Sequence, residues 1–395
     1  MKRTLLTALL LLIIVPCLNA QKKEIAQART YIKSGADFDK AEQLMTKLLA
    51  DSANARDVRV REVLAEAVRR QYEKENEKLY AGKDYDTTAL FTLTRRLFLA
   101  FEGLDSIDAM PPAKGKPALK FRRRNAEYAK PLRRNLFNGG IFFIRKRQFD
   151  KALPFMESYI DCTRQPLFTG ITNDGREPAA AFWALYCGYM RRDTAVVLRH
   201  AREAMRDTAH LERTYCYLAE TYRHRGDTAN YALMLRKGFG SYPKTEYFYT
   251  HLLDYYNDRG DTRAAASLID RALAASPGNH LLMYAKSSLL LNTGDYGGCV
   301  SICDTLIAQN DTLADAYYNA GVAYVNMAFR TERDSATSRK ALAEAKDYYR
   351  KALPYMERYR ALCPKEKDKW AAALYNIYLR LNMGKQFEEI DRLLR

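Results

Sequence analysis

A 34-residue period constrains this chain of 395 residues more than any other feature. Equivalent positions align without a gap in rows that begin at Pro178, Glu212, Glu246, His280 and Ala314. Each row has two halves, and in each half small or apolar residues recur at spacings of three and four, which places them on one face of an α-helix. Four successive rows carry an acid between the halves, at Asp193, Asp227, Asp261 and Asp295. The period therefore predicts one antiparallel helix pair in each row.

The columns of these rows resemble the tetratricopeptide repeat (TPR) family. The row that matches best has Tyr249, Leu252, Tyr256, Ala265, Ile269, Ala272 and Pro277. The resemblance covers residues 178–313 and implies an all-α fold. We therefore expect a TPR-like right-handed superhelix, an α-solenoid of antiparallel helix pairs in one elongated domain. The resemblance also implies a non-catalytic scaffold that binds a protein or peptide partner in its concave groove.

Weaker copies of the pattern extend the array in both directions. Upstream residues in the same columns include Ile25, Ala28, Ala41, Met45, Leu48, Leu136, Gly139, Gly140, Phe143, Ala152, Met156 and Tyr159. We expect N-terminal TPR-like pairs over residues 21–107, a linker over 108–117, and a pair with a basic segment and an inserted loop over 118–177. Four regular repeats over 178–313 then precede a repeat over 314–363 with an insertion at 329–339, and a capping helix pair over 364–395.

Residues 1–20 have the order of a secretory signal, with Lys2 and Arg3 before an apolar run and a small residue, Ala20, at the end. We expect cleavage after Ala20, so that the chain is exported and lies in the periplasm or at the cell envelope. Lipid attachment at Cys17 remains the alternative. The apolar run is shorter than the roughly 20 residues that span a bilayer, and no later segment qualifies, so the mature chain should have no transmembrane span.

Basic residues are concentrated between residues 114 and 147, in a chain whose net charge is +17. The candidate basic patch comprises Lys120, Arg122, Arg123, Arg124, Arg133, Arg134, Arg145, Lys146 and Arg147. Such clustering indicates a local positive field that fits an anionic envelope surface or an acidic partner. The alternative is a solvated face whose long side chains cover apolar helix surface. Nucleic acid is not an expected partner of an exported protein.

The resemblance also assigns groove positions, because the family lines its concave surface with particular columns of the first helix. The candidate groove residues are Phe182, Tyr186, Tyr189, Arg223, Tyr247, Asp254, Asn257, Tyr284 and Tyr318. Tyrosine suits such a surface because a rigid apolar ring with a polar tip loses little entropy on binding. The alternative is that tyrosines such as Tyr284 and Tyr318 merely pack between adjacent helices.

No motif in the sequence predicts catalysis, a cofactor or a metal site. None of the five histidines lies in HExxH, and no serine lies in GxSxG. Cys299 and Cys303 are one helical turn apart, which fits a buried core better than half a metal site. The rival function is a helical-toroid carbohydrate-active enzyme, which would need two carboxylates in one cleft. Disulfides remain open, and motifs such as Asp193-Thr194 either cap helices or accept O-linked sugars.

Overall fold

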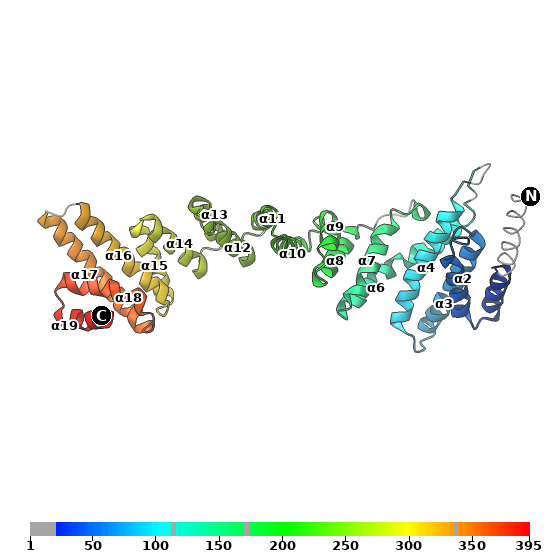
Figure 1. Cartoon of the computed structure of the whole chain (residues 1–395), viewed down its shortest axis with the longest axis horizontal. Coiled ribbons are helices and arrows are strands. Elements are labelled where there is room, and N and C mark those ends of the chain that lie inside the picture. Colours follow the sequence, from blue (N-terminus) through cyan, green and yellow to red (C-terminus); the bar gives the residue numbers. More distant parts are fainter. Residues whose placement is uncertain (1–20, 112–115, 118, 170–173, 335–337) are drawn as a thin grey trace, which may run out of the picture. The chain divides into compact units, whose positions relative to one another are not determined.

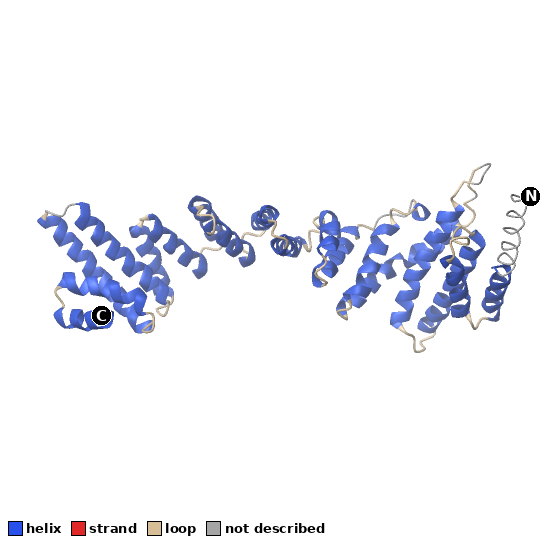
Figure 2. Ribbon diagram, viewed as in Figure 1, coloured by secondary structure: helices blue, strands red, loops and turns tan. Residues whose placement is uncertain are grey.

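The computed structural model describes residues 21–111, 116–117, 119–169, 174–334 and 338–395. The predicted signal segment, residues 1–20, lies outside this set. Throughout the described ranges the regular structure is helical and no strand is present (Figure 2). The chain divides into two compact units, Met1–Arg225 and Gly226–Arg395, and each is described by itself below.

The first unit consists of helices that pack against their neighbours in the chain (Figure 1). Its elements are the helix over residues 21–34, α2 (Phe38–Ala50), α3 (Val58–Tyr80), α4 (Thr87–Asp108), α5 (Arg122–Ala129), η1 (Lys130–Leu132), α6 (Arg133–Arg145), α7 (Phe149–Cys162), η2 (Pro166–Phe168), α8 (Glu177–Met190), α9 (Thr194–Ala204) and α10 (Leu211–His224). The pairs α3/α4, α6/α7 and α8/α9 are in close contact, and α7 also packs on α8. Successive helix pairs are thus stacked on one another, as a repeat array requires.

The second unit is built in the same way. Its helices are α11 (Thr228–Ser241), α12 (Glu246–Asn257), α13 (Thr262–Ala275), α14 (His280–Thr293), α15 (Tyr296–Gln309), α16 (Ala314–Asp334), α17 (Arg339–Leu362), α18 (Lys367–Leu381) and α19 (Gly384–Leu394). The most extensive packing joins α16 to α17, the two longest helices of this unit. The predicted all-α fold of antiparallel helix pairs is confirmed within each unit.

The division into units falls inside one of the 34-residue rows. The row that begins at Glu212 contributes α10 to the first unit and α11 to the second. One predicted insertion also takes a different form. Residues 329–334 continue α16 instead of forming a turn, and α17 begins at Arg339. The extra residues of this repeat therefore lengthen its helices, with residues 335–337 outside the described part.

The repeat columns supply the core. Near the start of the chain, Ile25, Ala28, Ala41, Met45 and Leu48 are buried in one hydrophobic cluster. In α6 and α7, Leu136, Phe143, Met156 and Tyr159 are at most 1% exposed. The thiols of Cys299 and Cys303 lie in the core of the second unit, which confirms the core interpretation of this pair. Burial of these columns supplies the main favourable free energy of such a stack.

The turns between paired helices repeat one construction. Asp193, Asp227, Asp261 and Asp295 each accept a hydrogen bond from a backbone N–H three residues ahead, at 3.0–3.1 Å. The residue before each aspartate has a positive φ: glycine precedes three of them, and Arg192 precedes Asp193 with a φ of 57°. These aspartates are N-caps, so capping accounts for their recurrence. Glycine is favoured before them because side chains other than Asn and Asp rarely adopt this left-handed conformation.

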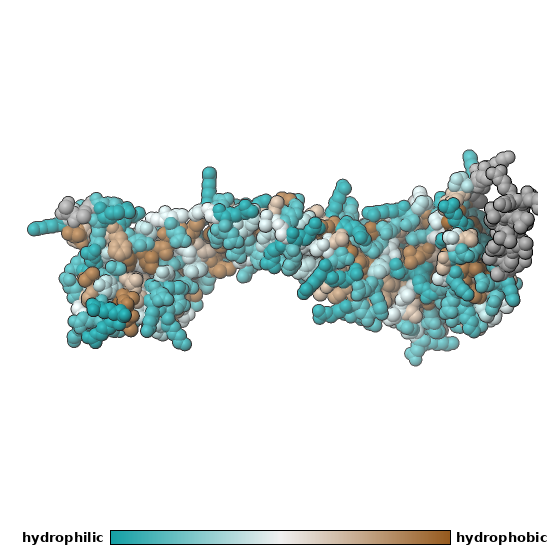
Figure 3. All heavy atoms as spheres, viewed as in Figure 1, coloured by the Kyte–Doolittle hydropathy of each residue, from teal (hydrophilic) through white to brown (hydrophobic). Residues whose placement is uncertain are grey.

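The described surface is largely polar. Figure 3 shows a mostly hydrophilic face with small, separate hydrophobic areas. Exposed large apolar side chains are scattered over several helices, for example Leu99, Leu281, Leu379 and Leu394. No helix in the described part of the chain is both long and apolar enough to cross a membrane.

Candidate partner-binding surfaces

An aromatic cluster joins α8 to α10 in the first unit. It consists of Trp183, Tyr186 and Tyr189 on α8 and Tyr217 on α10, all half-buried, and we call it the α8/α10 aromatic surface. The ring centroid of Tyr217 lies 5.6 Å from that of Tyr186 and 4.5 Å from that of Tyr189. Trp183 meets Tyr186 edge to face at 5.8 Å. The three α8 residues are spaced by three, which keeps them on one helix face.

The phenols of Tyr189 and Tyr217 stay protonated at neutral pH. Burial is the main cause that raises the pKa of Tyr189 and of Tyr217, and the Glu220 carboxylate adds to the effect on Tyr189. Each hydroxyl can therefore donate as well as accept a hydrogen bond. Rings that are half-buried and already packed lose little further freedom when a partner covers them. This surface can bind an apolar side chain and still satisfy polar groups of a peptide backbone.

Phe182 is not part of this surface. Its side chain is 1% exposed, and its ring stacks on that of His210 at 4.2 Å with an interplanar angle of 13°. The prediction that Phe182 is a groove anchor is therefore wrong, because the packing of α8 on the segment before α10 removes the ring from solvent. It helps to hold α10 beside α8, and so positions Tyr217.

A pocket of about 610 Å³ opens beside Tyr189, between α8, α9 and α10. Its apolar wall includes Met190 and Val197, and its polar groups include Arg192 and His224. Arg223, another predicted groove residue, is exposed on α10, and its Nη2 lies 2.6 Å from the Glu220 carboxylate. The aromatic surface thus adjoins a cavity that could accept a side chain, next to an ion pair.

The predicted groove residues of the second unit divide into exposed and packed ones. Tyr247 is half-buried, with its ring 4.4 Å from that of His251, while Asp254 and Asn257 are exposed on the same helix, α12. Tyr284 on α14 is 37% exposed. Tyr318 on α16 instead packs against the core, with its ring 5.1 Å from that of Tyr359. Tyr318 therefore fits the alternative prediction, in which its ring packs between adjacent helices.

Two members of the predicted basic patch are neutralised by partners in the first unit. Arg133 has a side chain that is only 5% exposed and lies 2.5 Å from Glu177 and 3.3 Å from Asp174. Arg122 makes two parallel bonds of 2.8 Å to Asp105, a buried carboxylate. The prediction of a surface role is wrong for Arg133, because acids from other segments enclose it.

The remaining basic residues form two groups rather than one patch. Lys120, Arg123, Arg124 and Arg134 are exposed at or before the start of α6, whereas Arg145, Lys146 and Arg147 are exposed at its end. Arg145 comes eleven positions after Arg134 on the helix, which corresponds to about 16 Å along the axis. Arg147 of the second group borders a hollow of about 720 Å³ together with Lys151 on α7 and Arg191 just after α8, where Arg191 binds Asp150 at 2.7 Å.

Sequence reasoning missed Trp183 and Tyr217. The spacing of three from Trp183 to Tyr186 could have indicated the first, but Tyr217 becomes a partner only through the packing of α10 on α8. Within the described ranges no group of three or more His, Cys, Asp or Glu residues could hold a metal ion. The six cysteines from Cys162 to Cys363 are free thiols.

No family model matches the chain, and no curated protein matches it. Similar solved structures include MamA residues 41-end from Desulfovibrio magneticus RS-1, at 18% identity and TM-score 0.36 over 47% of this chain and 95% of that one. The C-terminal part of a TPR repeat-containing protein from Cytophaga hutchinsonii is 12% identical, with a TM-score of 0.36. This match covers 64% of the present chain and 98% of that one. A human IFIT1 dimer with m7Gppp-AAAA is 14% identical, with a TM-score of 0.36, over 82% of the present chain and 72% of that one.

The helix pairs, the 34-residue period and the capped turns together assign the fold. The fold is of the tetratricopeptide-repeat type. Stacked TPR-type pairs present the first helix of each pair as a continuous surface, and α8 and α10 are such first helices in the rows that begin at Pro178 and Glu212. The TPR-type framework thereby brings Tyr217 beside Tyr186 and Tyr189.

Proposed function

We propose that this chain is a non-catalytic binding scaffold that holds a protein or peptide partner on its TPR-type first helices. The α8/α10 aromatic surface is the observation that carries the proposal. Its tyrosines are fixed by ring contacts, partly open to solvent and adjacent to the pocket of about 610 Å³ beside Tyr189. Aromatic anchors next to a cavity are typical of the residues that dominate the affinity of protein interfaces.

In the second unit, Tyr247, Asp254, Asn257 and Tyr284 are the corresponding candidates for partner contact. The order of residues 1–20 supports export, with the mature chain in the periplasm or at the envelope. A second candidate function is binding to an anionic envelope lipid or polysaccharide. The group Arg145, Lys146 and Arg147 favours it, because these three cations are exposed at the end of α6 and Arg147 lies beside Lys151 and Arg191 around one hollow.

Photo-crosslinking in the producing cell tests the principal proposal. A photo-crosslinking residue replaces Tyr217, and mass spectrometry identifies the protein that it captures. The same crosslinker at Tyr80, which is 85% exposed on α3, serves as the control position. The recovered partner should then bind Y186A roughly fivefold to thirtyfold more weakly than the parent. Because Tyr186 also contacts other rings, affinity is measured where circular dichroism shows both proteins fully folded.

A partner that crosslinks equally from Tyr80, or that binds Y186A as tightly as it binds the parent, would exclude the aromatic surface as the binding site. Binding that requires Arg145, Lys146 and Arg147 and falls steeply with salt would instead support the anionic surface.

A further inference from the structure

A small pocket lies near the start of the first unit, away from the α8/α10 aromatic surface. It has a volume of about 330 Å³ and is bounded by the helix over residues 21–34, α3, α4 and α5. Its floor is apolar, formed by Val63, Ala65 and Phe101, which are buried. The cavity is large enough for one side chain and has a polar rim.

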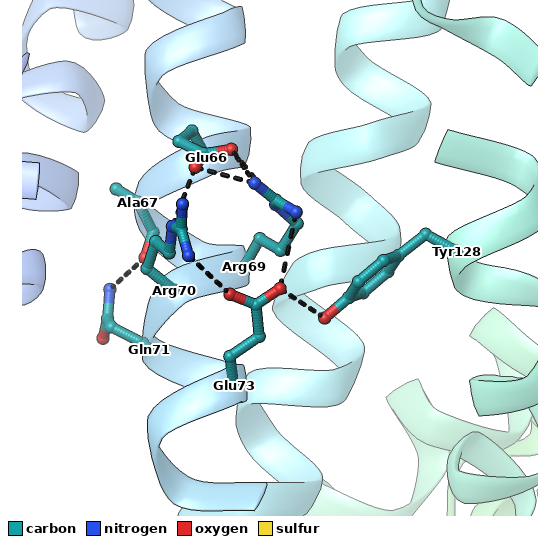
Figure 4. Close-up of polar contacts among 7 residues, drawn as sticks. All are labelled: Glu66, Ala67, Arg69, Arg70, Gln71, Glu73 and Tyr128. Atoms are coloured by element: carbon teal, nitrogen blue, oxygen red, sulfur yellow. Dashed lines mark hydrogen bonds and ion pairs between the residues drawn. The ribbon is translucent and has the colours of Figure 1, made fainter. Parts of the chain in front are cut away.

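The rim contains four cations and two carboxylates. One of the cations, Arg69, is fixed in place, because its guanidinium lies 2.6 Å from Glu66 and 3.4 Å from Glu73. Figure 4 shows Arg70 bridging the same two carboxylates, while the Tyr128 hydroxyl donates to Glu73 at 3.1 Å. This network neutralises Arg69 and makes one wall of the pocket rigid.

The other cations of the rim are less well compensated. Arg29 lies 3.8 Å from Glu62, which is long for an ion pair. Lys33 and Arg124, which are exposed, form no ion pair with any described residue. The rim therefore carries two positive charges that no acid of the described chain neutralises, one from the helix over residues 21–34 and one from α5.

Asn125 supplies an independent indication of a ligand. It lines the pocket, is 3% exposed, and its Nδ2 has no hydrogen-bond partner among the described residues. A buried amide donor without an acceptor costs about 1–3 kcal/mol. The last side-chain torsion of Asn is broad and roughly two-fold, so the amide can turn within its site. An acceptor bound there would remove this cost.

We propose that this pocket binds an acidic side chain of a peptide, with its carboxylate between Lys33, Arg124 and Asn125. The inference rests on the proposed scaffold function and specifies the chemistry of the partner. A carboxylate accepts bonds from all three groups, and its aliphatic stem fits the apolar floor. The Glu62 and Glu66 carboxylates oppose a doubly charged phosphate but can accept bonds from peptide N–H groups, so the mixed rim favours a peptide.

Fluorescence anisotropy of the full chain with a short, end-blocked peptide of alternating Glu and Leu tests this assignment. The double variant K33Q/R124Q should bind the peptide roughly tenfold more weakly or worse. R123Q is the matched control, because Arg123 lies on the same helix, is 91% exposed, pairs with Glu127 and does not line the pocket. N125L should also weaken binding severalfold without loss of thermal stability, since the buried Nδ2 has no partner to lose.

Several results would overturn the proposal. One is that a peptide with Gln in place of Glu binds as tightly as the acidic peptide. Another is that R123Q weakens peptide binding as much as K33Q/R124Q does. The third is that inorganic phosphate displaces the bound peptide as effectively as unlabelled acidic peptide does. The outcome is separable from that of the proposed function. If a partner crosslinks at Tyr217 but the acidic peptide does not bind, only the pocket proposal is refuted. If the peptide binds but no partner crosslinks at Tyr217, only the role of the aromatic surface is refuted.

Discussion

Gly238 in α11 lies directly against the ring of Phe248 in α12, so that a Cβ at position 238 would overlap the ring. Phe248 is fully buried, so its ring packs inside the core and not against solvent. Glycine is therefore required here by the close approach of two helices, not by its backbone conformation.

The first prediction follows from this contact. G238A should lower the free energy of unfolding by about 1–3 kcal/mol, because an added methyl group overpacks a filled site. G240A provides the control, since a Cβ there meets nothing within 4 Å. In an exposed helix position alanine should stabilise by up to about 1 kcal/mol. Urea denaturation followed by circular dichroism measures both, and similar shifts in the two variants would contradict the prediction.

The second prediction concerns the buried ion pair of Arg133 and Glu177. R133M leaves the Glu177 carboxylate buried without its cation, so we expect a loss of about 3–5 kcal/mol of stability. R134M makes the same change at the neighbouring exposed residue and should alter stability by less than about 0.5 kcal/mol. Adding E177L to R133M should recover much of the loss. Failure of this rescue would mean that Arg133 contributes through packing rather than charge compensation.

The third prediction is a pH dependence. Burial, reinforced by the nearby Asp161 carboxylate and opposed by Arg95, raises the pKa of Glu102 from 4.5 to about 7. The folded protein therefore binds more protons at this group than the unfolded chain does, and its contribution to stability decreases as the pH rises from about 4.5 to 7. E102Q should raise the melting temperature at pH 8 relative to the parent but not at pH 4.

Glu127 provides the comparison for Glu102, because its side chain is 67% exposed on α5. E127Q should leave the shape of the melting temperature profile between pH 4 and pH 8 unchanged. A parent profile that E102Q does not flatten would show that another group is responsible for the pH dependence.

The fourth prediction concerns thiol reactivity. Burial raises the pKa of Cys162 and of Cys187 to about 12, so both remain protonated as well as inaccessible at pH 8. Cys363 is only half-buried. Mass spectrometry can follow iodoacetamide labelling at each cysteine. We expect Cys363 to react first, and Cys162 and Cys187 to react only when urea unfolds the protein. Native-state labelling of Cys162 at the rate of Cys363 would contradict the described packing.

Local spacing in the sequence is sufficient for the helix pairs and for their caps. The recurrence of small and apolar residues at three and four places Ala265, Ile269 and Ala272 on one helix face, and all three are buried. Asp227 and Asp261 cap helices because each carboxylate reaches an N–H three residues away. Interactions of such short range depend on the local order of residues, which the printed sequence contains in full.

Only tertiary packing separates residues that the repeat columns treat alike. Phe182 and Tyr186 are both groove positions by column, yet the stacking of His210 buries the first and leaves the second partly open. Arg133 and Arg134 are adjacent cations, and Glu177, 44 residues away, encloses one of them. Exposure and charge compensation depend on side chains from helices distant in the sequence, so a periodic pattern within one helix does not contain them.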